Sequence, residues 1–284
     1  MHASASVDVV GGISYDRYEV TRAEDFTAAR GVFEYPKGGS DAFNWQGAVI
    51  WRYSPSAQIH AGVSDRARFP ILFELYSTRF GTATPNPDLG PERATNLEVG
   101  WKGRSTDGLR LETTVFYMDI RDLIQTVVLP EATTQTQNVG DGRFYGAEVA
   151  VDASLTSALT IGGNYTAISR TIRDALQPSL RPTGVPTHKA FLYAAWRPVE
   201  KLTVTPSVDV AGDRWSDVNT NPVPAFPYLR TGSYTLLDLS IQYSAQRNFD
   251  VVLGLKNLTD RNYELSWGFP EPGRSFYIKT RVGL

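Results

Sequence analysis

Few residues of this sequence could carry out chemistry. Its 284 residues include three histidines, His2, His60 and His188, and no cysteine. The histidines lack the spacing of a metal-binding pair, and the absence of cysteine excludes a thiolate site or a disulfide framework. The chain also lacks a glycine-rich phosphate-binding loop. The sequence therefore predicts no enzyme, no cofactor and no metal centre. A Ser/His/Asp hydrolase built on His60 or His188 stays open as a minor alternative.

Charge and composition narrow the class of protein. The formal net charge is −2 and the pI is near 6.0, so charge indicates no nucleic-acid partner. No run of 18 apolar residues exists, and the sequence predicts no transmembrane helix. A spanning β-strand needs only alternate apolar residues, so a mean hydropathy of −0.25 does not exclude the membrane. The first ten residues lack the features of a signal peptide, and we expect the start of an exported protein to be missing.

Apolar and polar residues alternate along much of the chain. From Ala5 to Tyr15 the odd positions are mostly apolar, over about the ten residues that a tilted strand needs to cross a bilayer. The pattern recurs, and it predicts twelve strands at about 4–16, 43–54, 57–65, 93–103, 108–122, 142–153, 158–170, 187–197, 201–212, 234–244, 248–258 and 274–284.

The connections between these strands alternate between long and short. Short turns are expected around Pro55-Ser56, at 105–108, around Ser154, at 198–200 and at 245–247. The other connections are long and polar, at 17–42, 65–92, 124–141, 171–186, 213–233 and 259–273. Membrane barrels have short periplasmic turns and long extracellular loops, whereas a soluble sandwich has no reason to place every long loop at one end. The sequence therefore predicts an all-β fold, a transmembrane antiparallel up-and-down barrel.

Strand parity assigns side chains to the two faces. Aromatic residues precede the short turns, as in a periplasmic girdle: Trp51, Tyr53, Trp101, Trp196 and Tyr243. Charged residues fall on the inward face, where a wet lumen removes the cost of about 2–4 kcal/mol that a lipid-facing charge would incur: Arg110, Glu112, Glu148, Asp152, Lys279 and Arg281. Either parity fits the strand at 187–197, and we favour a lipid-facing set of Ala190, Leu192, Ala194 and Trp196.

Seven short segments, in order over residues 69–284, resemble the barrel of TonB-dependent receptors. The two most distinctive are Asn86-Pro87-Asp88-Leu89-Gly90-Pro91-Glu92, with 96–100 behind it, and Leu255-Lys256-Asn257-Leu258-Thr259-Asp260-Arg261-Asn262-Tyr263. The others lie at 69–76, 116–124, 138–148, 186–189 and 272–276. The resemblance assigns a structural role to the motif residues Asn86, Pro87, Leu89, Pro91, Glu92, Asn257, Leu258, Asp260, Tyr263, Gly273 and Arg274.

The resemblance covers only part of such a receptor. Family members carry an N-terminal plug, a TonB-binding segment and a barrel of about 22 strands. Residues 1–284 are therefore expected to be a partial barrel domain that lacks the plug and the first barrel strands. Open sheet edges are not tolerated in lipid, so either the missing strands come from elsewhere or the twelve strands close on themselves.

The resemblance implies uptake of a bulky, scarce nutrient across the bacterial outer membrane. A ferric siderophore is the favoured ligand, and vitamin B12, haem and carbohydrate stay open. The implied partners are outer-membrane lipid, the small-molecule metal chelate or vitamin, and the TonB complex acting through the missing plug. Loop aromatic and basic residues are the candidate ligand contacts: Tyr35, Phe80, Arg143, Trp215, Tyr228, Trp267, Phe269 and Arg274. A passive porin-like channel and a non-functional receptor fragment remain as alternatives.

Overall fold

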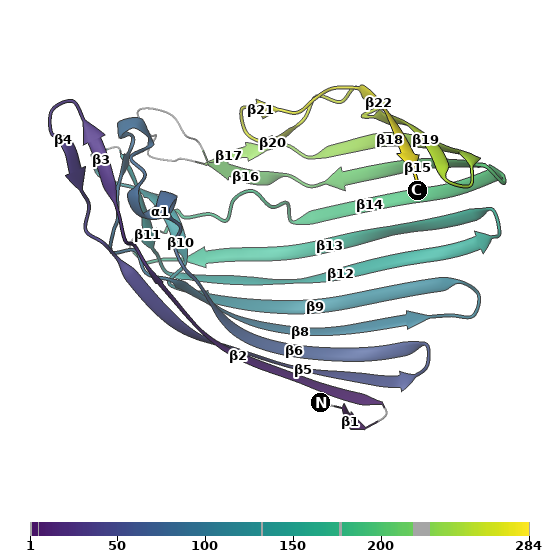
Figure 1. Cartoon of the computed structure of the whole chain (residues 1–284), viewed down its shortest axis with the longest axis horizontal. Coiled ribbons are helices and arrows are strands. Elements are labelled where there is room, and N and C mark those ends of the chain that lie inside the picture. Colours follow the sequence, from purple (N-terminus) through teal and green to yellow (C-terminus); the bar gives the residue numbers. More distant parts are fainter. Residues whose placement is uncertain (1, 5, 132, 176–177, 218–227, 284) are drawn as a thin grey trace.

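The computed structural model describes residues 2–4, 6–131, 133–175, 178–217 and 228–283. In this part of the chain, twelve long strands form one antiparallel sheet in which each strand pairs with the next long strand along the chain (Figure 1). The short strand β1 (His2–Ser4) is added at the first edge. The long strands are β2 (Val7–Glu19), β5 (Gly39–Ser54), β6 (Ala57–Arg68), β8 (Glu92–Arg104), β9 (Leu109–Arg121), β12 (Asp141–Thr156), β13 (Leu159–Arg173), β14 (His188–Val199), β15 (Leu202–Ala211), β18 (Tyr234–Gln246), β19 (Phe249–Lys256) and β22 (Ser275–Val282). Each overlaps a strand predicted from the sequence, with ends that differ by up to about four residues.

The sheet is curved but not closed. Its order runs from β1 and β2 to β22, and among the described residues β22 pairs only with β19. Figure 1 shows a curved wall with the two termini at opposite edges. The alternative that the twelve strands close on themselves is therefore wrong for this structure.

The outward face is apolar, as the period-two pattern predicts. Backbone pairing aligns outward residues in rows across the sheet, such as Val9, Val49, Ala61, Val99 and Val115. Most of these side chains are exposed in the isolated chain, which is expected of a surface that faces lipid. In β14, Leu192 and Trp196 are 55% and 51% exposed, and Ala190 and Ala194 pair with Tyr165 and Ile161 of the same face. The structure thus agrees with the favoured parity.

Long and short connections lie at opposite ends of the strands. The short turns after β5, β8, β14 and β18 fall at or within one or two residues of their expected positions. The turn expected around Ser154 instead lies at 157–158, because β12 continues to Thr156 and keeps Ser154 paired with Thr160. None of the helices in the described residues is long and apolar enough to cross a membrane.

The long loops contain small elements of their own, which the sequence did not predict. These are β3 (Glu24–Thr27), β4 (Gly31–Glu34), α1 (Leu72–Tyr76), η1 (Arg79–Gly81), β7 (Ala83–Thr84), β10 (Ile124–Val128), β11 (Thr134–Asn138), β16 (Arg214–Asp217), β17 (Tyr228–Thr231), β20 (Glu264–Ser266) and β21 (Phe269–Pro270). Two buried apolar clusters lie among the loops, one of Val20, Ala23, Leu75, Leu89 and Ile124 and the other of Val127, Val139 and Leu180. The loops are therefore packed structures that can hold side chains in fixed positions.

Candidate functional site: a basic and aromatic cluster in the last three long loops

Three long loops meet around Trp215. The loop at 174–187 contributes Arg181, whose guanidinium carbon lies 4.5 Å from the centre of the Trp215 ring. The amide of Gly184 in the same loop donates a hydrogen bond to the Trp215 carbonyl at 2.9 Å. The loop at 257–274 contributes the Trp267 amide, which donates to the Ser216 hydroxyl at 3.2 Å. The hairpin of β16 and β17 is thus held from both sides.

The two faces of this hairpin differ in their surroundings. Antiparallel pairing sets Arg214 opposite Thr231 and Trp215 opposite Arg230. Alternate residues of a strand point to opposite sides, so Arg214 and Ser216 share one face with Thr231. All three are buried, and the Ser216 and Thr231 hydroxyls are 2.6 Å apart. Arg230 lies on the other face, with its guanidinium carbon 5.9 Å from the Trp215 ring centre and an ion pair to Asp213.

Arg214 is the most unusual residue of the cluster. Its side chain stacks on Tyr234, with 5.3 Å between the guanidinium carbon and the ring centre, and the residue is only 7% exposed. Among the described residues, its Nε and Nη2 atoms have no hydrogen-bond partner. Leaving a buried charged group without partners costs more than 1–3 kcal/mol, roughly the penalty for an unpaired neutral group. A bound anion would supply the missing acceptors.

A second aromatic pair borders Arg214. The rings of Tyr234 and Tyr263 lie 4.9 Å apart, and burial raises the pKa of the Tyr263 phenol, with a smaller contribution from the Glu271 carboxylate. The phenol therefore stays neutral at physiological pH. Neutral aromatic faces beside guanidinium groups suit a ligand that is both anionic and aromatic.

The structure brings together three of the residues predicted from the sequence. Trp215, Tyr228 and Trp267 lie in this cluster, with Tyr228 only 5% exposed and opposite Asp217 in the hairpin. Phe269 is 72% exposed in β21 of the same loop, and the backbone amide of Arg274 donates to Asp260 at 2.7 Å. The sequence analysis missed Arg181, Arg214, Arg230 and Tyr234. The only signal for them was that arginines and a tyrosine occur in or beside the same long loops.

The other predicted contacts lie elsewhere. Tyr35 packs on the cluster of Val20, Leu75 and Leu89, and its hydroxyl donates to Asp25 at 3.2 Å. Arg143 lies on the outward face beside Tyr145 and pairs with Asp119 at 3.3 Å. Phe80 belongs to η1, and its side chain lies outside the described part of the structure. A binding role for these three residues stays a prediction.

The motif residues hold loops together. Glu92 accepts hydrogen bonds from Arg68 and from the amide of Ile124, while Arg68 also pairs with Glu74. Asn86 donates to the Thr136 carbonyl at 2.8 Å, and Leu89 is buried in the first loop cluster. These contacts fasten the loop at 69–91 to the hairpin of β10 and β11.

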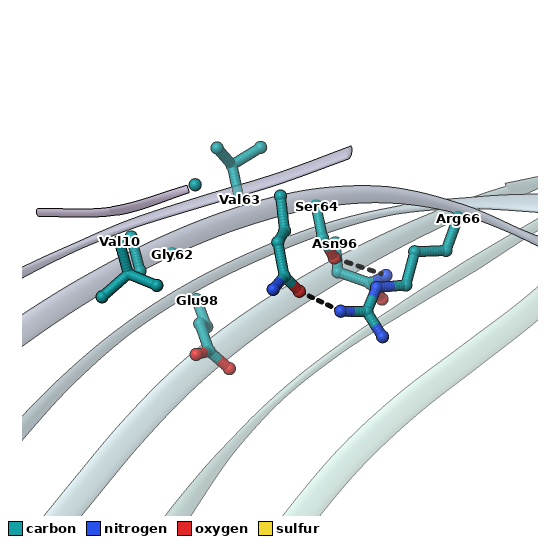
Figure 2. A pocket seen from close by; sticks show the side chains of 10 residues that line it. Val10, Gly62, Val63, Ser64, Arg66, Asn96 and Glu98 are labelled. Carbon is teal, nitrogen blue, oxygen red and sulfur yellow. Dashed lines mark hydrogen bonds between the residues drawn. The ribbon is translucent and has the colours of Figure 1, made fainter. Parts of the chain in front are cut away.

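The inner wall of the sheet carries a separate polar hollow of about 300 Å³. Figure 2 shows Ser64, Arg66, Asn96 and Glu98 around it. Arg66 donates to Gln46, and Asn96 donates to Ser64 at 3.3 Å. A charged and amide-rich inner wall agrees with the predicted inward placement of polar residues. Lys102 and Glu112 form a further ion pair at 2.6 Å on the same face.

His60 and His188 lie on opposite faces of the sheet. His188 Nδ1 lies 2.7 Å from the hydroxyl of Tyr165 at the outward face, and His60 points to the inner wall beside Gly100. No group of three or more His, Cys, Asp or Glu side chains that could hold a metal is found in the residues the structure describes.

An open antiparallel wall with an apolar outer face, a polar inner face and long packed loops at one end defines a section of an outer-membrane β-barrel. The family profile described as "TonB dependent receptor-like, beta-barrel" matches residues 1–258. The chain belongs to this family and to the bacterial outer membrane, and its relatives are receptors and transporters rather than enzymes.

Individual relatives are similar at low sequence identity. The iron-regulated outer membrane virulence protein of Vibrio cholerae serotype O1 is 23% identical over 275 residues, covering 89% of this chain and 41% of that protein. The catecholate siderophore receptor Fiu of Escherichia coli K12 is 25% identical over 283 residues, covering 90% of this chain and 36% of Fiu. The crystal structure of the siderophore receptor PiuA from Acinetobacter baumannii superposes with a TM-score of 0.75 at 19% sequence identity, covering 98% of this chain and 41% of PiuA. The chain thus spans about two fifths of the length of these relatives.

Proposed function

We propose that this chain is part of a TonB-dependent outer-membrane transporter for a bulky anionic metal chelate, specifically a ferric siderophore. The observation that carries the proposal is the buried Arg214, whose Nε and Nη2 atoms lack partners among the described residues and whose guanidinium stacks on Tyr234. Arg181 and Arg230 add positive charge around the neighbouring Trp215.

A ferric siderophore fits this cluster in charge and shape. Anionic oxygens of the chelate would accept hydrogen bonds from Arg214, and its rings would stack on Tyr234 or Tyr263, which border Arg214. Relatives named for siderophores and for iron regulation support the same ligand class.

We further propose that residues 1–284 form one section of a larger barrel. The two open edges of the sheet need strands to pair with in lipid, and the relatives are more than twice as long as the matched region. In this proposal the plug and the TonB contact lie in the remainder of the longer protein.

The test is the affinity of the whole receptor for ferric chelates. Arg214→Gln is expected to weaken binding of a ferric catecholate or hydroxamate by about tenfold to a hundredfold, since hydrogen bonds to a charged group contribute about 1.5–3 kcal/mol. Quenching of tryptophan fluorescence measures the Kd, and uptake of radioactive iron by cells measures transport.

The matched control is Arg22→Gln. Arg22 lies in the first long loop with its side chain 78% exposed and paired with Glu24, so this variant should bind as the wild type does. Unchanged affinity in Arg214→Gln, with the same β-sheet content by circular dichroism, would exclude the loop cluster as the ligand site.

A further inference from the structure

The outward face of the sheet carries a hollow over its first strands. An apolar hollow of about 720 Å³ lies over β2, β5, β6, β8 and β9. Its lining includes Val49, Ala61, Val63, Leu97, Val115 and Tyr117. All six have the outward parity, so the hollow opens towards lipid, on the opposite face of the same strands from the polar hollow of the inner wall.

Backbone register explains the hollow. One row across the strands reads Gly11, Gly47, Val63, Leu97 and Tyr117, so two glycines face two larger side chains and an aromatic ring. A Cβ atom added to Gly47 would meet nothing within 4 Å. The small residues Gly11, Gly47 and Ala61 of β2, β5 and β6 therefore form the bottom of the hollow. The larger side chains of β8 and β9 project beside it.

Positive charge lies above the hollow, towards the long loops. Four residues from Leu97 and Tyr117, the same face carries Arg93 and Arg121, which are directly opposite each other in the ladder. Like charges in this position repel. Both point to one carboxylate, because Arg93 pairs with Asp65 and Arg121 Nη2 lies 3.7 Å from Asp65 Oδ2.

Arg121 retains capacity for an anion. Its side chain is 56% exposed, and Asp65 is already engaged by Arg93 and by the Thr95 hydroxyl at 2.7 Å. The neighbouring Asp119 is paired with Arg143 at 3.3 Å. Asp141 of β12 also lies opposite Arg121 in the ladder, and Arg173 lies on its other side. The four arginines of this outward belt thus face three carboxylates, Asp65, Asp119 and Asp141.

We propose that the hollow binds one lipid of the outer leaflet, with an acyl chain over Gly47 and Ala61 and a phosphate of the headgroup on Arg121. A hollow that faces hydrocarbon is filled by hydrocarbon, because an empty one loses its dispersion contacts. Four residues of a strand span about 13 Å, a separation that a headgroup and the upper part of its chain can bridge. Guanidinium groups bind phosphate with paired hydrogen bonds, and basic sites beside spanning segments recognise lipid headgroups.

The lipid site is independent of the transported ligand. It needs only the membrane position of the sheet, so it would stand if the chelate proposal failed.

The test is the lipid that remains on the whole receptor after purification from outer membranes and detergent exchange. Native mass spectrometry is expected to find about one phosphorylated lipid bound per wild-type molecule. The double variant Gly47→Leu with Ala61→Leu fills the hollow and should lower this occupancy at least fivefold. Arg121→Gln should keep an acyl lipid but lose the preference for phosphorylated headgroups when lipids are re-added from mixed micelles.

The matched control is Ala190→Leu, an equally outward small residue on β14. It should keep the bound lipid. The proposal would be overturned if the filled variant retained as much lipid as the control. It would also be overturned if the wild type carried no lipid, or carried a co-purifying protein in place of lipid. Folding is checked for each variant by the shift in gel mobility between unheated and heated samples.

Discussion

Asn257 and Asp260 show how single residues shape the last long loop. Both have positive φ, 51° and 52°, a conformation in which Asn and Asp are the least disfavoured residues after glycine. The Asn257 side chain bonds the amide and the carbonyl of Arg261, both at 2.8 Å, and Asp260 accepts from the amide of Arg274. A Cβ at Gly273 would lie 2.6 Å from Asp260 Oδ1, so a larger residue there would displace the Asp260 side chain from its bond to Arg274. These residues were predicted to be structural, and the geometry gives each one a physical task.

The ionisation of Tyr263 provides a prediction at this scale. Its folded-state pKa is raised by burial and then by Glu271, so the stabilisation is fully present below the unfolded pKa of about 10 and is lost as the pH rises through the raised value. Thermal unfolding between pH 9 and 12 should therefore show a steeper fall in Tm for the wild type than for Tyr263→Phe, which cannot ionise. Parallel curves for the two proteins would show that Tyr263 is not linked to folding.

The residues around Arg214 mark the limit of sequence analysis. Aromatic and basic residues in long loops could be named as candidates, and Trp215, Tyr228 and Trp267 do come together. The alternation of residues within a strand does not reveal which loops pack against each other. Which arginine is buried depends on that packing. Arg214 could therefore not be distinguished from exposed arginines such as Arg22.

At the scale of elements, the long strands were predictable and the small loop hairpins were not. Ten residues with alternating polarity give a strong signal, whereas β3 and β4 have four residues each. β10 and β11 are held by contacts with distant segments, because β11 pairs with β7 some 50 residues earlier through Thr134 and Ala83. Such short strands depend on tertiary packing more than on local pattern.

Asn138 offers a test of how these elements are joined. Its side chain accepts from the Gly90 amide at 2.8 Å and donates to the carbonyls of Gly90 and Asp122 at 3.0 and 2.9 Å. Loss of three bonds at about 1 kcal/mol each should free the loop at 69–91 in Asn138→Ala and raise its rate of amide hydrogen exchange by tenfold or more. Gln125→Ala, on the same hairpin but outside these bonds, should exchange at the wild-type rate. If both variants match the wild type, Asn138 does not fasten the loop.

At the scale of the whole molecule, the open sheet is the feature that the sequence left undecided. The number of strands and the alternation within them were compatible with a closed twelve-stranded barrel and with a sheet that continues into further strands. The two arrangements have the same inward and outward faces and the same turns. Only the path of the sheet in space separates β2 from β22, and that path depends on accumulated twist rather than on local pattern.

The absence of cysteine makes the open edges testable by cross-linking. Cysteines introduced at Val99 and Val115, which are direct partners in the ladder, should form a disulfide on oxidation. Cysteines introduced at Val9 and Thr280, on the first and last long strands, should stay reduced within one chain. Rapid formation of the second disulfide in monomeric protein would mean that the twelve strands close after all.

The nearest-neighbour order of the sheet also bears on how the protein assembles. Every long strand lies beside the long strand that precedes it, and five of the connections are tight turns, so each pairing joins strands that are consecutive in the chain. No pairing among these long strands needs a crossover between strands distant in the chain, so the entropy lost on closing each loop is smaller than in a sheet of the same size with long-range pairings. The wall can grow one hairpin at a time, and each added hairpin covers the exposed edge left by the one before it.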